Sequence, residues 1–235
     1  LVQRADRDAA VFIVFGIEEG KEAAERGVLI GYDTRTTNQM LDQAICAGLL
    51  ESGVNVIKIG MVPTPLVGYA TEKLDADAGV MLTASHNPSP YNGIKLWNKN
   101  GMAYTSEQEA KIEEIYSDKS YISVSWDKIG QLSVNEEIKG KYVDDLVNLV
   151  DIKEGLKVVI DCASGAGSEI SPLVFRKAGC EVTTLNSQPD GFFPGRNPEP
   201  NDANLGSLKK AVVATESDLG IAHDGDADRM LAVDE

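Results

Sequence analysis

VLIGYDTRTTNQMLDQAICAGLLESGVNVIKIG, residues 28–60, is the stretch that predicts the fold. The apolar run at 28–33 predicts a buried strand, and apolar residues recurring at helical spacing from Leu41 to Leu49 predict a helix after it. Ser52 and Gly53 end the helical pattern, and residues 55–60 predict a second strand. The order strand, helix, strand is typical of a parallel sheet covered by helices.

The same alternation continues along the chain. We expect a helix from about Pro63 to Leu74, because proline is tolerated in the first turn of a helix. Further strands are predicted at 78–83, 91–97, 157–160, 181–185 and 219–222, and further helices at 106–117, 166–178 and 205–214. The sequence therefore predicts two consecutive α/β domains, each with a mixed, mainly parallel sheet covered by helices.

The domain boundary is expected where this periodicity fades, between residues 118 and 137. We predict domains at 1–133 and 134–235, the second opening on a helix with Ile138, Tyr142, Leu146 and Leu149 on one side. Within the second domain, 189–204 is a long loop dense in proline, glycine and asparagine. Loops of that length inside compact domains are often functional.

Composition excludes several classes of protein. A net charge of -15 argues against nucleic-acid binding, which needs a basic face. No apolar run approaches the roughly 20 residues that cross a bilayer. The three cysteines lack metal-ligand spacing and are expected to be reduced, and the charged start at 1–8 does not read as a signal peptide, so we expect a cytoplasmic protein.

TASHNP at 83–88 follows a predicted strand directly, at the sheet edge where open α/β folds place ligands. Ser85 is the natural nucleophile, and His86 beside it is a candidate base. Taken alone, this hexapeptide favours a structural role, in which Ser85 and Asn87 cap a turn before proline. NGIK at 92–95 shifts the balance, because Lys95 returns a cation suited to phosphate to the same region.

DGDADR at 224–229 also follows a predicted strand, and its three aspartates at alternate positions would share one side of an extended segment. Such crowding is costly unless a hard divalent cation neutralises it. A calcium EF-hand loop is the competing interpretation, but Arg229 stands where that loop requires glycine. Magnesium held by Asp224, Asp226 and Asp228 is therefore favoured. DCASGAG at 161–167 fits no phosphate-binding fingerprint and is interpreted as a structural turn.

Together, TASHNP, NGIK and DGDADR resemble the motifs of the α-D-phosphohexomutases, the family of phosphoglucomutases, phosphomannomutases and phosphoglucosamine mutases. GYDTR at 31–35, PTP at 63–65 and PGRNPEPN at 194–201 support the resemblance, in the family's order. The resemblance implies an intramolecular phosphotransferase, an isomerase that interconverts hexose 1-phosphate and hexose 6-phosphate. Phospho-Ser85 would donate its phosphoryl group to the sugar phosphate and form a bound hexose 1,6-bisphosphate.

The same resemblance implies the residue roles. Ser85, His86 and Lys95 would be catalytic, and Mg²⁺ would be held by Ser85 together with the three aspartates. The substrate and phosphate would be bound by Asn87, Arg35 and Arg229.

The chain also departs from the family pattern. It begins LVQRADRD, followed by a helix-like region at 8–16, where members have an FGTSGIRG-like loop with an active-site arginine. It stops after the metal loop, without the family's third and fourth domains, so we expect an incomplete fragment whose partners are the missing C-terminal domains or further copies in a homo-oligomer. The alternative function is a non-catalytic module that binds metal and phosphate, or a partner subunit without mutase activity. A degenerate relative is least favoured, because the serine, the lysine and all three aspartates are retained.

Overall fold

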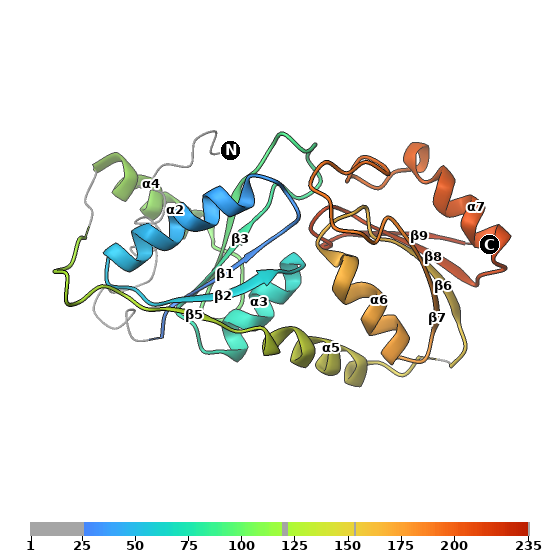
Figure 1. Cartoon of the computed structure of the whole chain (residues 1–235), viewed down its shortest axis with the longest axis horizontal. Helices are drawn as coiled ribbons and strands as arrows, with labels where there is room; N and C mark the ends of the chain where they lie inside the picture. The colour runs from blue at the N-terminus through green and yellow to red at the C-terminus, as the bar shows by residue number, and fades with distance from the viewer. Residues whose placement is uncertain (1–25, 119–121, 153, 235) are drawn as a thin grey trace.

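The structure is a computed structural model that describes residues 26–118, 122–152 and 154–234. It contains two α/β units, each built on its own sheet, and this confirms the predicted fold class (Figure 1). The helix-like region expected at 8–16 lies outside the described residues. In the part that is described, no helix combines the length and the apolar character needed to cross a membrane.

The first unit has a five-stranded sheet in the order β4-β3-β1-β2-β5. Its central strand pairs in parallel with β2 and β3, while β4 runs antiparallel to β3. The strands are β1 (Val28–Tyr32), β2 (Val56–Met61), β3 (Ala78–Leu82), β4 (Ile94–Asn98) and β5 (Leu132–Val134).

Alternating side chains of β1 separate the two faces of this sheet, because successive residues of a strand point to opposite sides. Val28 and Ile30 pack with α2 (Asn38–Glu51), whereas Leu29 packs with α3 (Thr64–Lys73). The sheet is therefore the middle of three layers, with α2 above it and α3 below it in Figure 1. Helix α4 (Ser106–Asp118) follows β4 in the chain.

The second unit repeats the plan of the first. Its sheet has the order β7-β6-β8-β9, with β6 parallel to both β7 and β8, and with β9 antiparallel to β8. Helices α6 and α7 cover opposite faces. The elements are β6 (Lys157–Asp161), α6 (Gly167–Lys177), β7 (Glu181–Leu185), η1 (Asp202–Asn204), α7 (Gly206–Ala214), β8 (Leu219–His223) and β9 (Met230–Val233).

The polar connector predicted between residues 118 and 137 contains an element that the sequence did not indicate. Strand β5 pairs in parallel with β2, so that Val134 lies opposite Lys58 at the edge of the first sheet. All three residues of β5 are exposed, so the sequence has no buried apolar positions there from which a strand could be predicted. The boundary predicted between 133 and 134 falls inside β5 and stays a prediction.

Helix α5 (Glu137–Leu149) joins the two units and packs against both. Its Ile138 and Val143 belong to the apolar cluster that contains Leu66 of α3 and Ile170 of α6. Because one cluster takes side chains from both units, the two units pack against each other through α5.

Candidate active site

The loop after β3 and the loop after β8 meet between the two sheets. Ser85 follows β3 by three residues, and Asp224 follows β8 directly. The Ser85 hydroxyl donates to Asp224 Oδ2 over 3.1 Å, although the two residues are 139 positions apart in the chain. The structure therefore brings the predicted nucleophile and a predicted metal ligand into contact.

The three aspartates form a compact cluster of carboxylates. One oxygen of each lies within 4.8 Å of the others, and Asp224 and Asp226 are fully buried. Burial, with the charges of Asp226 and Asp228, raises the pKa of Asp224 to about 7. The cluster is thus costly to ionise unless a cation lies among its members.

Lys95, on β4 of the first unit, supplies one such cation. Its Nζ lies 2.8 Å from Asp226 and 2.8 Å from Asp228. Burial opposes ionisation of Asp226, but the Lys95 ammonium and a 2.6 Å hydrogen bond from the Thr64 hydroxyl outweigh it and lower the pKa of that carboxyl. The same carboxylates raise the pKa of Lys95 against the opposing effect of its burial.

Arg229 closes the other side of the nucleophile. Its Nη2 lies 3.1 Å from Asp224 Oδ2, 3.4 Å from Ser85 Oγ and 3.2 Å from Glu199 Oε2. Nδ1 of His86 lies 3.4 Å from Ser85 Oγ and 3.7 Å from Glu199 Oε2. Two nitrogen-bearing groups therefore face the serine oxygen, and one carboxylate faces both of them.

The carboxylate cluster fits a magnesium ion. Mg²⁺ prefers oxygen ligands and is commonly held by one or two carboxylates, with water and phosphate oxygens completing its shell. Asp226 Oδ1 is buried and has no hydrogen-bond partner in the protein, so a ligand oxygen is left over after Lys95 and Thr64 have bound the other oxygen. Unpaired buried carboxylate oxygens are costly, which favours a cation at this position.

Arg35 does not reach the site in the way expected from the sequence. Its side chain is fully buried, and its Nε binds Asp33 Oδ2 at 3.0 Å. Its remaining donors bind main-chain carbonyl oxygens of residues 85, 87, 88 and 91. All five N–H groups are thus bound within the protein in this structure, and phosphate binding by Arg35 stays a prediction.

Asn87 uses its side-chain amide to close the turn, donating to the carbonyl of Ala84 over 2.9 Å. This contact matches the structural role that the hexapeptide favours when taken alone. A contact between Asn87 and a substrate stays a prediction.

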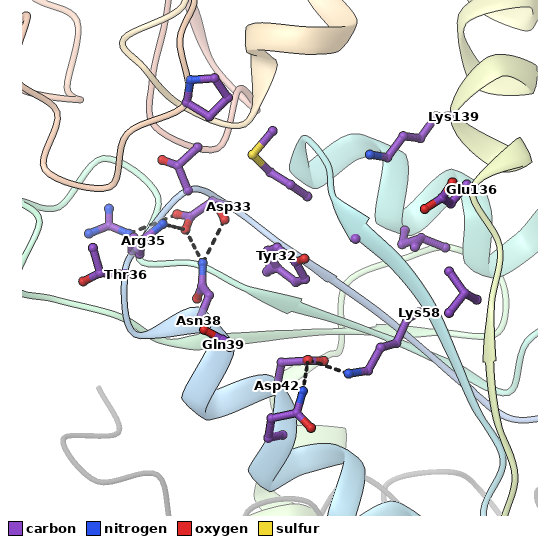
Figure 2. A pocket seen from close by; sticks show the side chains of 17 residues that line it. Tyr32, Asp33, Arg35, Thr36, Asn38, Gln39, Asp42, Lys58, Glu136 and Lys139 are labelled. Atoms are coloured by element: carbon purple, nitrogen blue, oxygen red, sulfur yellow. Dashed lines mark hydrogen bonds and ion pairs between the residues drawn. The ribbon is translucent and has the colours of Figure 1, made fainter.

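A hollow of about 560 Å³ beside α2 is separate from these groups (Figure 2). Lys58 and Lys139 are among the residues that line it, while Ser85 and the three aspartates are not. Lys58 is already bound to Asp42 at 2.6 Å. The hollow therefore lacks the chemistry found between the two sheets.

Two groups at the site were not predicted from the sequence. Thr64 and Glu199 lie within PTP at 63–65 and PGRNPEPN at 194–201, stretches that resemble the family but suggest no role for these two side chains. Both are polar residues in proline-rich segments, which is also the composition of an ordinary turn. The structure shows their partners: Thr64 donates to Asp226, and Glu199 lies beside His86 and Arg229.

Comparison with known proteins identifies two matching regions. Residues 8–122 match the family model described as "Phosphoglucomutase/phosphomannomutase, alpha/beta/alpha domain I". Residues 140–235 match the corresponding model of "alpha/beta/alpha domain II".

Among similar proteins, a "Probable phosphoglucosamine mutase" of Methanobrevibacter smithii is 83% identical over 211 residues, covering 90% of this chain and 47% of the relative. A "Phosphoglucosamine mutase" of Methanococcus maripaludis is 49% identical over 211 residues, and the match covers 88% of this chain and 47% of that relative. The chain thus spans about half the length of the curated relatives it matches.

Among solved structures, a phosphoglucomutase/phosphomannomutase family protein of Burkholderia thailandensis is 27% identical, with a TM-score of 0.85. The match covers 100% of this chain and 52% of that one. The similarity in structure therefore extends over both units.

Proposed function

Because the chain belongs to the phosphoglucomutase/phosphomannomutase family of α-D-phosphohexomutases, we propose that it forms the phosphoserine and metal half of a mutase acting on hexosamine phosphate. The observation that carries this proposal is the contact of 3.1 Å between Ser85 Oγ and Asp224 Oδ2. The choice of glucosamine phosphate as the sugar rests on the names of the relatives from M. smithii and M. maripaludis.

In the proposed reaction a hydroxyl oxygen of the bound sugar phosphate attacks the phosphorus of phospho-Ser85. The bond between phosphorus and Ser85 Oγ breaks, the sugar hydroxyl releases its proton to water, Ser85 Oγ takes up one proton, and the product is a hexosamine 1,6-bisphosphate. The bound intermediate then reorients within the site, and its other phosphoryl group is transferred back to Ser85. Phosphoryl transfer of this kind depends mainly on in-line positioning and on nearby cations.

The side chains around Ser85 Oγ can manage the charge that develops on this oxygen. Arg229 Nη2 and His86 Nδ1 each lie 3.4 Å from it. As Ser85 Oγ leaves the phosphorus, Arg229 can donate a hydrogen bond to it and His86 can donate a proton to it. In the return step His86 can accept the proton of the Ser85 hydroxyl as this oxygen attacks. Glu199 Oε2 lies beside both groups, 3.7 Å from His86 Nδ1 and 3.2 Å from Arg229 Nη2.

We propose that Asp224, Asp226 and Asp228 hold Mg²⁺, with phospho-Ser85 as a further ligand. When bound, the ion would supply positive charge that stabilises the oxygens of the transferring phosphoryl group. Lys95 already binds two of these carboxylates and can turn to a phosphate when a metal takes its place.

A cytoplasmic location is proposed for the same protein. Cys46, Cys162 and Cys180 are all buried and unpaired, as is typical of proteins from reducing compartments.

The test is the intact mass of the protein before and after incubation with magnesium and glucose 1,6-bisphosphate. We expect one added phosphoryl group, which should be absent from Ser85→Ala. Failure of the native protein to become phosphorylated would favour the alternative of a module that binds metal and phosphate without catalysis. For the sugar, kcat/KM of the complete protein should be higher with glucosamine 6-phosphate than with glucose 6-phosphate, and the opposite order would rule out hexosamine.

A further inference from the structure

Each unit contains a buried aspartate–arginine pair at the end of its central strand. In the first unit, Asp33 follows β1 and accepts hydrogen bonds from the Arg35 main chain at 2.9 Å, from Arg35 Nε at 3.0 Å and from Asn38 at 2.7 Å. Figure 2 shows Arg35 and Asn38 joined to this carboxylate. Both members of the ion pair have fully buried side chains.

In the second unit, Asp161 ends β6 and has the same set of partners. It accepts from the main chain two residues on, at Ala163, over 2.9 Å, from Arg196 Nε at 2.8 Å and from Asn186 at 3.0 Å. The side chains of Arg196 and Asp161 are 3% and 2% exposed. The two pairs are therefore equivalent in position and in partners, although Arg35 is local in sequence and Arg196 comes from the long loop at 189–204.

Each arginine is bound to the functional loop of its own unit. Arg35 donates to four carbonyl oxygens of the nucleophile loop at 2.7 to 2.8 Å, including that of Ser85 itself at 2.8 Å. Arg196 donates at 2.6 Å to the carbonyl of His223, the residue directly before Asp224. A planar guanidinium with five N–H groups can hold several fixed acceptors at once, which a lysine ammonium cannot.

The carboxylate of the first pair also holds the other end of the nucleophile loop. Thr83 donates its hydroxyl to Asp33 at 2.7 Å and accepts from the Ser85 main-chain N–H at 2.8 Å. Ser85 is thus held at its N–H through Thr83 and at its carbonyl by Arg35. These contacts fix a serine whose φ of 52° is in the left-handed region.

The loop that carries Arg196 also covers Arg35. The Phe193 ring lies over the Arg35 guanidinium, 5.2 Å from centroid to Cζ. A Cβ added to Gly191 would lie 2.4 Å from the carbonyl oxygen of Thr34, so the loop packs tightly against the turn that carries Arg35. The loop at 189–204 therefore packs directly on the turn that carries Arg35 and keeps its guanidinium out of water.

We propose that Arg35 and Arg196 are positioning residues, Arg35 for the nucleophile Ser85 and Arg196 for the metal ligand Asp224. The inference rests on the proposed function and adds to it two residues that touch neither substrate nor metal. It assigns them separate effects: Arg35 governs the rate of phosphoryl transfer at Ser85, and Arg196 governs the affinity for the metal.

The test compares Arg35→Lys and Arg196→Lys in the complete protein, with the exposed Arg176→Lys of α6 as the control. Metal affinity is measured by titration with Mg²⁺ and with Mn²⁺. The rate of Ser85 phosphorylation by glucose 1,6-bisphosphate is measured by intact mass at saturating metal and donor. Should either lysine variant fail to fold, the glutamine variant at that position replaces it, since glutamine keeps a planar donor.

We expect crossed effects. Arg196→Lys should weaken metal binding about 10- to 100-fold, as is typical when a group that orients a ligand is lost, and should leave the rate at saturating metal unchanged. Arg35→Lys should lower the maximal phosphorylation rate about 100-fold, with the half-saturating donor concentration unaltered, and should change metal affinity less than Arg196→Lys does, because it leaves the three aspartates in place. Equal losses of both quantities in both variants would indicate a merely structural role and overturn the proposal, as would two variants that behave like Arg176→Lys.

Failure of the proposed function can be told apart from failure of this inference. If native Ser85 is never phosphorylated, the proposed function fails, while the metal titrations still test Arg196. Crystal structures of the variants then test Arg35: the Ser85 Oγ to Asp224 Oδ2 distance should lengthen from 3.1 Å in Arg35→Lys. An unchanged distance and loop would overturn the role of Arg35.

Discussion

Ser85 combines a reactive position with an unfavourable backbone. Its φ of 52° is adopted readily by glycine, whereas other residues lose about 1–2 kcal/mol there. The nearby Gly225 admits this conformation, since a Cβ at that position would lie 2.7 Å from the Ser85 carbonyl oxygen. The nucleophile is therefore held in place at some expense of stability, as is common at functional sites.

Replacing Ser85 should separate this strain from its chemistry. Ser85→Gly and Ser85→Ala both lack the hydroxyl, but only glycine relieves the backbone, so Ser85→Gly should be more stable than Ser85→Ala by about 1 kcal/mol. Urea denaturation of the two variants measures the difference. Equal stabilities would mean that the left-handed backbone at this position carries no measurable strain.

The carboxylate cluster predicts an effect of pH on stability. The pKa of Asp224 is raised from 3.8 to about 7, so without metal the folded protein binds more protons than the unfolded chain between these values. Its free energy of unfolding should therefore fall as pH rises from about 4 to about 7. Asp224→Asn removes this effect and should be more stable than the native protein at pH 8, by on the order of 2 kcal/mol, in the presence of a chelator.

Two controls measure the free energy of unfolding of both proteins, one at acidic pH and one with added metal. Near pH 4 the two proteins should have similar stability, because Asp224 is then protonated. Excess Mg²⁺ at pH 8 should stabilise the native protein and leave Asp224→Asn less affected. A native protein that is the more stable of the two at pH 8 without metal would contradict the prediction.

At the residue scale, the sequence predicts side chains that act through their own chemistry. Ser85, Lys95 and the three aspartates could be identified because each is a reactive or charged group directly after or within a predicted strand. The sequence suggests a phosphate for Arg35 and no role for Arg196, because most of the acceptors that these two arginines bind are main-chain carbonyls far away in the chain. No side-chain pattern marks such acceptors.

At the scale of elements, alternation predicted nearly every helix and strand. Buried strands such as β1 and β3, followed by turn residues, carry a strong signal. Strand β5 carries none, since its three exposed residues join the sheet only through main-chain pairing with β2. An edge strand of this kind is specified by its neighbour more than by its own residues.

The turn from β6 to α6 is the element that packs directly against the metal loop. A Cβ on Gly165 would lie 2.4 Å from the carbonyl oxygen of Gly225, and Ala166 donates its N–H to that same oxygen at 2.9 Å. Gly165→Ala should therefore displace the metal loop, lower stability by about 1–3 kcal/mol and weaken Mg²⁺ binding. Thermal unfolding and metal titration measure the two effects.

Helix α5 provides a matched control for this substitution. Gly140 is exposed within the helix, and an added Cβ would meet nothing within 4 Å. Gly140→Ala should stabilise the protein by about 0.5–1 kcal/mol through helix propensity and leave metal binding unchanged. Similar behaviour of the two variants would show that the close approach at Gly165 has no consequence.

At the scale of the whole molecule, the apolar cluster shared by α3, α5 and α6 should make the two units unfold together. Calorimetry should give one transition, with equal calorimetric and van't Hoff enthalpies. Ile170→Ala in α6 should lower the stability of both units by about 2–5 kcal/mol, because it leaves a cavity in the shared cluster.

The exposed Leu173 on the same helix provides the comparison. Leu173→Ala should change stability by less than about 0.5 kcal/mol. Two separate transitions in the native protein would contradict the prediction, because they would mean that the shared cluster does not couple the sheets.

The matching strand orders of the two sheets also bear on the history of the molecule. Duplication of one ancestral unit would leave four strands in the same order and directions in each sheet, β4-β3-β1-β2 in the first and β9-β8-β6-β7 in the second, and an aspartate–arginine pair at the same place in each; β5 has no counterpart. Asp33 is linked to Thr83 and Asp161 pairs with Ala222, so Ser85 and Asp224 each come two residues after the partner of that aspartate. On this view, descendants of a single ancestral loop came to face each other and diverged, one towards a nucleophile and the other towards carboxylates.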